Sequence, residues 1–357
     1  MINRGRYTSG RIAVANLSAS IESLELRAVE HPGFEDLVGL SKLLFVRGDL
    51  LGRIVDHDRA ELVANEAIAL SPSPADAFYI RARIAERFHR FDEAGALLDQ
   101  ALVAGYSTRE VDVERAALWQ ATGKYGEALV LRKKLAKEDP GIHTLGALAT
   151  LLSEMDQSAA AEHRYAAALD ADDGVSPLPC AQLLFEWGVG AMRHGELVRA
   201  ETIFAELDAI LPAHVPGRGH RAELALARGQ LDLAADLIIP LLETSDDPEY
   251  RATYAEILAA RGERQAALIE AECAAAAYEL LLVRRPEAYA DHAAAFFMGI
   301  GNRPQLAADL AVANRKLRDT PRSRSLLARA LRKAEQVSLG DGVPHFGFPS
   351  NSQSVFQ

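Results

Sequence analysis

Residues 75–105 read ADAFYIRARIAERFHRFDEAGALLDQALVAG, and this stretch decides the fold. Phe78, Ala82 and Ala85 follow one another at spacings of four and three, which places them on one face of a helix. A polar turn at 89–92 ends this pattern. A second apolar face then follows, made of Ala94, Leu98 and Ala101, and Gly105 ends it. The stretch therefore predicts two helices joined by a short turn.

The hairpin recurs along the chain at a nearly constant step. The alanines near the start of each second helix lie 34, 34, 33, 39, 34 and 33 residues apart. They are Ala60, Ala94, Ala128, Ala161, Ala200, Ala234 and Ala267. A period near 34 residues is typical of a stacked helix–turn–helix array. A small residue suits this place because the two helices approach each other closely there.

Several positions in four of the units match the repeat pattern of one known family, and they include four of the alanines. They are Ala82, Ala94 and Ala101 in one unit, Gly123, Tyr125, Ala128 and Pro140 in another, Gly188, Gly195, Ala200, Phe204 and Pro212 in a third, and Ala60, Ala64, Ala67 and Pro72 in the first. Over roughly residues 34–320 the chain resembles the tetratricopeptide-repeat family. The resemblance implies an all-α fold, a right-handed α–α superhelix (a solenoid) of about eight repeats with capping helices. It also implies a concave groove lined by the first helix of each repeat.

The pattern divides the chain into five segments. The one long step of 39 residues falls at 172–179 and separates two blocks of repeats. The segments are an N-terminal segment with a capping helix at 1–33, a first block at 34–173, a second block at 174–321, a C-terminal capping helix at 322–336 and a flexible tail at 337–357. A solenoid needs such caps to cover its open ends.

Two repeats depart from the pattern. The repeat that ends at Asp173 has Asp156 and Gln157 where the turn glycine is expected. The first repeat carries an insertion between Gly48 and Asp58, and we interpret Asp58 as the N-cap of the helix that follows.

The bulk composition limits the function classes. The chain has 357 residues and a formal net charge of −11, so general binding to nucleic-acid phosphates is disfavoured. Its two cysteines, Cys180 and Cys273, form no close motif for metal or redox chemistry. We read neither a signal peptide nor a membrane span and expect a cytoplasmic protein, or a periplasmic one if a leader was removed.

The sequence offers no catalytic constellation, and we expect neither an enzyme nor a cofactor. His214 and His220 lie in the stretch HVPGRGH, which we interpret as a polar loop, because a zinc site needs three or four ligands. The cluster at 56–58 contains two aspartates and a histidine and could be a set of metal ligands, but Asp58 is more simply interpreted as a helix N-cap. Trp119 and Trp187 fall on core faces of their helices. We therefore expect no metal site.

The best candidates for ligand contacts lie on the face of the first helices that lines the groove in the family. Tyr79, Arg83 and Arg87 form a stripe at helical spacing, and Arg with an aromatic is favoured in binding hot spots. The alternative is a solvated face with Glu86 as a local partner of the arginines. The same register adds Lys42, Thr150, Phe185, Arg193 and Glu223.

Three functions remain open from the sequence. The first is a non-catalytic interaction scaffold that binds a peptide or a helix of a partner protein. The second is an accessory subunit that presents or matures a peptide substrate for an enzyme, and the third is an enzyme on a helical-repeat scaffold. The paired lysines and asparagines with which chaperone-binding members of the family hold a carboxylate are absent. The basic stretch at 315–333 could bind an acidic partner, a phosphate or the chain's own acidic body, or it could be a solvated cap.

Overall fold

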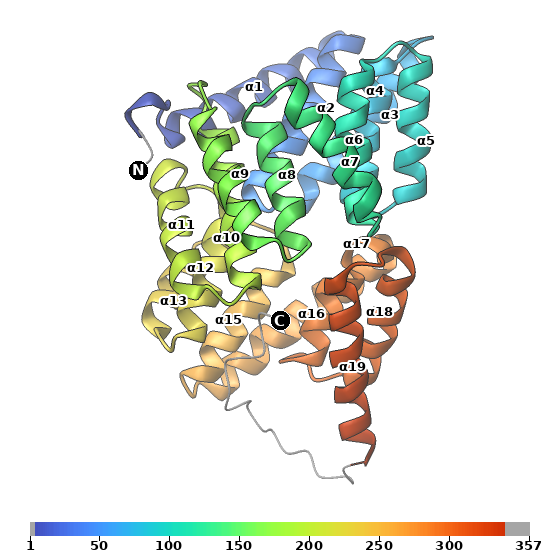
Figure 1. Cartoon of the computed structure of the whole chain (residues 1–357). Coiled ribbons are helices and arrows are strands. Elements are labelled where there is room, and N and C mark those ends of the chain that lie inside the picture. Colours follow the sequence, from blue (N-terminus) through green and yellow to red (C-terminus); the bar gives the residue numbers. More distant parts are fainter. Residues whose placement is uncertain (1–3, 340–357) are drawn as a thin grey trace. The chain divides into compact units, whose positions relative to one another are not determined.

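The computed structural model describes residues 4–339, and all of its regular elements there are helices (Figure 1). Eight helical hairpins follow one another in the described residues, and in most of them the first helix packs against the second. They are α2 (Phe34–Leu51) with α3 (Ile54–Leu70), α4 (Ala75–Arg87) with α5 (Phe91–Val103), α6 (Thr108–Ala121) with α7 (Tyr125–Glu138), α8 (Ile142–Glu154) with α9 (Ser158–Asp170), α10 (Pro177–Arg193) with α11 (Leu197–Ile210), α12 (Val215–Ala227) with α13 (Leu231–Ile238) and α14 (Leu241–Thr244), α15 (Pro248–Ala260) with α16 (Arg264–Arg284), and α17 (Pro286–Met298) with α18 (Pro304–Leu317). The predicted all-α repeat architecture is confirmed.

The chain forms two compact units. The first contains residues 1–192 and 196–218, and the second contains residues 193–195 and 219–357. The change of unit comes later than the block boundary at 173/174 that the spacing suggests, so that boundary stays a prediction. Among the helices of residues 4–339, none is both long and apolar enough to span a membrane.

The turns within the hairpins need a left-handed residue. Gly123, Gly195 and Gly262 have φ angles of 87°, 74° and 82°, which glycine adopts without steric cost. Where the sequence lacks this glycine, Asp156 takes the same conformation with φ 59°. Aspartate tolerates this region better than most residues, so the predicted exception in the repeat keeps the same turn.

The core repeats with the sequence period. The alanines near the start of the second helices are almost fully buried, as Ala94, Ala128 and Ala200 illustrate. In the α10–α11 hairpin, Gly188 faces Phe204 so closely that a Cβ atom would lie 2.6 Å from the ring. The close approach of the two helices of a hairpin therefore explains why small residues recur where the helices face each other.

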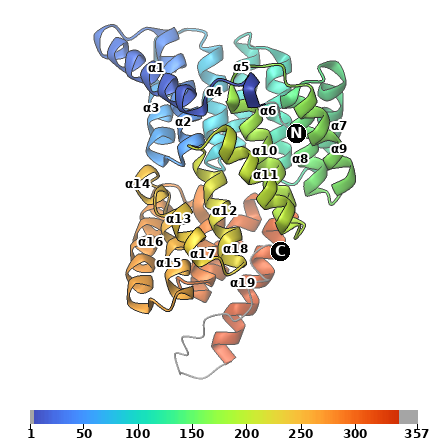
Figure 2. The ribbon, with the colours of Figure 1, turned by 90° about the vertical axis from the view of Figure 1, so that its left-hand side faces the viewer.

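The N-terminal segment joins two distant parts of the first unit. A short helix, η1 (Arg4–Arg6), precedes α1 (Gly10–Glu30), and both lie within the N-terminal segment 1–33. The Thr8 amide donates to the Val175 carbonyl at 2.8 Å, and the Tyr7 hydroxyl donates to Asp172 at 2.8 Å. Arg6 also pairs with Asp172 at 3.0 Å. Figure 2 shows α1 running beside the first hairpins.

Two local predictions were wrong. Asp58 does not cap a helix, because α3 begins at Ile54 with Arg53 at its N-cap. The residues of the expected insertion form the end of α2, the turn at 52–53 and the first turn of α3. The stretch around His214 and His220 is not a loop, because α12 begins at Val215. Pro216 lies in the first turn of α12, where its missing N–H would have no partner within the helix, so it is compatible with the helix.

The C-terminal cap is longer than expected. Helix α19 runs from Pro321 to Leu339, so it includes the predicted cap at 322–336 and the first residues of the expected tail. Leu326 and Ala330 are buried against α17 and α18. The remainder of the tail, 340–357, lies outside the described residues.

Candidate functional site

A row of charged and aromatic side chains crosses three neighbouring first helices of the first unit, α2, α4 and α6. We call it the first-helix row. Its members are Lys42, Phe45 and Asp49 of α2, Asp76, Tyr79, Arg83 and Arg87 of α4, and Glu114 of α6. Ion pairs link each helix of the row to the next. The row therefore holds the stripe that the sequence singled out.

Glu114 organises the centre of the row. The Tyr79 hydroxyl donates to Glu114 at 2.9 Å, and the Arg83 Nε lies 3.3 Å from the same carboxylate oxygen. The Tyr79 ring stacks on Tyr106 with 4.4 Å between centroids, and the Arg83 guanidinium lies 4.8 Å from the centroid of the Phe45 ring. These contacts fix both side chains before any ligand arrives, which lowers the entropic cost of binding.

The environment favours the protonated forms of both central residues, Arg83 and Tyr79. Burial opposes the charge of Arg83 and is the largest single effect, but Glu114, Tyr79 and Asp49 together outweigh it and raise the pKa of Arg83. Burial, with a smaller effect from Glu114, raises the pKa of Tyr79 well above its usual range. At neutral pH the row presents a charged guanidinium beside a neutral phenol.

The end of the row joins Arg87 to a buried histidine through Asp49. The Arg87 Nε lies 3.5 Å from Asp49, and the same carboxylate oxygen lies 3.0 Å from the His57 Nε2. Burial would raise the pKa of Asp49, but His57 and Arg87 outweigh it and lower that pKa. The side chains of Asp49 and Arg87 remain 44% and 37% exposed, so a partner can reach both.

Lys42 belongs to the same row, whereas Thr150 and Phe185 have contacts inside their own hairpins. Lys42 pairs with Asp76 at 2.9 Å. The Thr150 hydroxyl donates to the Gly146 carbonyl of its own helix and accepts from the hydroxyl of the buried Tyr165. Phe185 is half-buried against Phe204 and His214. The roles of these residues in binding stay predictions, and the contacts of the last two favour packing.

Glu223 belongs to the second unit, where charged pairs line neighbouring first helices. Glu223 lies 2.8 Å from the His220 Nδ1 on α12, and Glu249 of α15 lies 3.1 Å from the His292 Nδ1 of α17. Burial opposes the charge of His292, but Glu249 and Asp291 outweigh it and raise its pKa to about 9. Burial would raise the pKa of Glu249, but His292 lowers it to about 2.

Arg193 and the basic C-terminal helix meet in the same unit. Arg193 lies close enough to Arg322 for their charges to repel, and burial together with this repulsion lowers the pKa of Arg322. Arg318 pairs with the buried Asp291 at 3.3 Å. Part of the basic stretch is therefore neutralised by the repeats themselves, and its docking role stays a prediction.

The acidic partners in the row escaped the sequence analysis. Lys42 and Asp76 are 34 residues apart, and Tyr79 and Glu114 are 35 apart, each close to one repeat period. Residues one period apart occupy neighbouring first helices. A donor side chain and a carboxylate at this separation were therefore the signal that could have identified the acidic partners. The tryptophans are half-buried: Trp187 stacks on Tyr165 with 5.2 Å between centroids.

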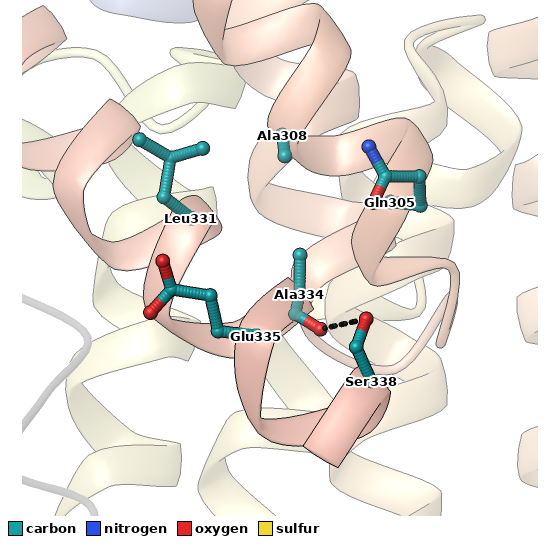
Figure 3. Close-up of a pocket in the computed structure, with 6 residues that line it drawn as sticks. All are labelled: Gln305, Ala308, Leu331, Ala334, Glu335 and Ser338. Carbon is teal, nitrogen blue, oxygen red and sulfur yellow. Dashed lines mark hydrogen bonds between the residues drawn. The ribbon is translucent and has the colours of Figure 1, made fainter.

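Other parts of the described chain offer less for chemistry. Between residues 4 and 339, no group of three or more His, Cys, Asp or Glu side chains could hold a metal ion. An open cavity of about 320 Å³ lies between α18 and α19, and Figure 3 shows the side chains that line it. Its lining is mainly apolar, with Glu335 at one side, and comprises Gln305, Ala308, Leu331, Ala334, Glu335 and Ser338.

Comparison with known proteins returns similar solved structures. One is a tetratricopeptide repeat protein from Parabacteroides merdae, with 20% identity over 68% of this chain and 91% of that chain and a TM-score of 0.43. Another is the type IV pilus biogenesis factor PilW, with 18% identity over 60% of this chain and 96% of that chain and a TM-score of 0.44. A third is the Cut9–Hcn1 hetero-tetramer of the APC/C, with 15% identity over 83% of this chain and 55% of that chain and a TM-score of 0.49. No family model and no curated protein matches the chain.

Proposed function

We propose that the chain is a non-catalytic interaction scaffold that binds a peptide or a helix of a partner protein on the first-helix side of its repeats. The observation that carries this proposal is the first-helix row, in which Tyr79, Arg83 and Arg87 are held by Glu114 and Asp49 yet remain partly exposed. Preorganised tyrosine and arginine side chains are the residues that dominate binding energy at protein interfaces.

The alternating charges suit a polar partner segment. Each cation of the row has an acidic neighbour at 2.9–3.5 Å, so the surface presents donors and acceptors side by side. A peptide can exchange some of these contacts for its own without leaving a charge unpaired, which limits the desolvation cost. The aromatic pair of Tyr79 and Tyr106 adds apolar area beside these charges.

The test is partner capture by the full chain and by matched variants. Arg83→Gln with Arg87→Gln removes two cations of the row without placing new charges beside Glu114 and Asp49. The control, Arg109→Gln with Arg115→Gln, removes two cations from α6 that pair outside the row, with Asp139 and Asp99.

We expect the row variant to recover at least fivefold less of a given partner, identified by mass spectrometry, while the control recovers as much as the native chain. Circular dichroism must show that all three proteins are equally helical. Equal recovery by the row variant and the native chain would remove the row from the binding surface.

A further inference from the structure

Arg132 of α7 occupies a core position that is apolar in the other repeats. It follows the repeat alanine Ala128 by four residues. The residues at the same offset in the other second helices are all apolar and buried, and they are Ala64, Leu98, Tyr165, Phe204, Ile238, Ala271 and Ala311. Arg132 is only 8% exposed. A long charged side chain therefore lies where the repeat normally packs an apolar one.

Arg132 has no internal partner among residues 4–339. Its Nε is enclosed without an acceptor, and no hydrogen bond or ion pair reaches its guanidinium there. Arg81 is equally buried but pairs with Glu61 and Glu93 at 2.8 Å and donates to Asn65. The enclosed Nε cannot be reached from outside, but the two terminal nitrogens of the guanidinium are not among the enclosed atoms and have no hydrogen bond within residues 4–339. A charged group without a partner is costly to bury, so these terminal donors are the ones that an outside acceptor can satisfy.

The surroundings place the guanidinium near the first helices. The carboxylates of Glu86, Glu114, Glu154 and Glu186 belong to α4, α6, α8 and α10, and all four favour the charge of Arg132. Burial nevertheless outweighs them and lowers the pKa of Arg132. The carboxylates are thus near enough to act through space but are not hydrogen-bonded to the guanidinium.

We propose that Arg132 donates to a backbone carbonyl oxygen of a peptide bound on the first-helix side of the first unit, and that this peptide is basic. The inference deepens the proposed function and rests on it. A carbonyl is neutral, whereas an acidic ligand group would be repelled by the four surrounding glutamates. The same glutamates attract lysine or arginine side chains that flank the bound carbonyl.

The key variant is Arg132→Leu, which restores the residue that the α4–α5 hairpin has at this offset, Leu98. Lys133→Leu is the matched control, because Lys133 is exposed on the same helix and carries the same charge. The probes are two labelled octapeptides with blocked ends, one of alternating lysine and alanine and one of alternating glutamate and alanine. Fluorescence anisotropy at low ionic strength gives their dissociation constants for the full chain.

We expect Arg132→Leu to raise the melting temperature by about 2–4 °C, because it removes a buried unpaired charge. The same variant should bind the lysine peptide about tenfold more weakly, because a hydrogen bond from a charged donor is lost. Charge alone predicts the opposite, since a groove that loses a cation attracts a basic peptide more strongly. Lys133→Leu should leave the melting temperature and the binding nearly unchanged.

Four outcomes would overturn the inference. One is a lower melting temperature of Arg132→Leu with unchanged binding, which would make Arg132 a structural residue. Another is equal weakening by the Lys133→Leu control, and a third is tighter binding of the glutamate peptide. If the native chain captures a partner through the first-helix row but binds neither peptide, this inference alone fails. If it also captures no partner, the proposed function fails with it.

Discussion

Replacing Gly188 with alanine should destabilise the α10–α11 hairpin. The new Cβ would lie 2.6, 2.7 and 2.9 Å from three ring carbons of Phe204, which is fully buried and has no room to move. Overpacking of this kind costs about 1–3 kcal/mol. Alanine returns up to about 1 kcal/mol through its better helix propensity. The net loss of unfolding free energy is therefore between about zero and 3 kcal/mol.

Gly95→Ala in α5 separates the two effects. Its Cβ would lie 3.7 Å from a methyl carbon of Leu118, which is an ordinary contact. This variant gains the same propensity without overpacking, so it should be more stable than the native chain by up to about 1 kcal/mol. The difference in stability between the two variants isolates the packing cost, which we expect to be about 1–3 kcal/mol.

Urea unfolding of the full chain measures this difference. Far-UV circular dichroism reports all helices. In a Trp119→Phe background, used for every variant, the fluorescence of Trp187, next to Gly188 in the sequence, reports the affected hairpin. Coincident transitions would license a two-state analysis, and separate transitions would make the local signal the relevant one. A Gly188→Ala midpoint as high as that of Gly95→Ala would refute the packing argument.

A compensating substitution strengthens the test. Gly188 and Phe204 are sixteen residues apart, and so are Ala82 and Leu98 of the α4–α5 hairpin. Ala82 and Leu98 pack in one core cluster, so alanine and leucine fit together at this spacing. Phe204→Leu in the Gly188→Ala background should therefore recover part of the lost stability, and a double-mutant cycle measures that coupling. No coupling between the two substitutions would show that the ring is not the obstacle.

Two further predictions concern charged contacts. Asp172→Ala should lower the free energy of unfolding by about 1–3 kcal/mol, because Tyr7 and Arg6 lose the carboxylate that accepts from them. Hydrogen exchange of the backbone amides just before α1 should become faster. Unchanged exchange would contradict the role of Asp172 in holding the N-terminal segment. His292 should titrate near pH 9 by NMR and shift toward 6.5 in Glu249→Gln. Because its folded pKa is raised, its contribution to stability is complete below about pH 6.5 and is lost as the pH rises through about 9. A native midpoint near 6.5 would contradict the ion pair.

The repeat pattern predicted the helices and turns well where glycine occurs only in turns. The turn glycines lie at positive φ, and Ala75 begins α4 as the period implies. The prediction failed where glycine had another role. Gly219 was interpreted as part of a loop, but it lies inside α12, where a Cβ would come within 2.6 Å of the Tyr250 ring. A glycine at a close helix contact and a glycine in a turn look alike in a sequence.

The candidate site was only partly predictable. Helical spacing within α4 identified Tyr79, Arg83 and Arg87, because residues four apart share a face. It could not identify Glu114 and Asp49 as their partners, because these belong to neighbouring hairpins. The helices must pack before residues one repeat apart become neighbours.

The sequence by itself determined the repeating helical hairpin, since periodic small and apolar residues fix which faces of adjacent helices can meet. The tertiary structure alone decided which charges pair across hairpins and which, such as the guanidinium of Arg132, find no partner among residues 4–339. The physical reason is that helix periodicity is local. Pairing and burial instead depend on the distances and rotations between packed helices, which individual residues adjust by fractions of an ångström.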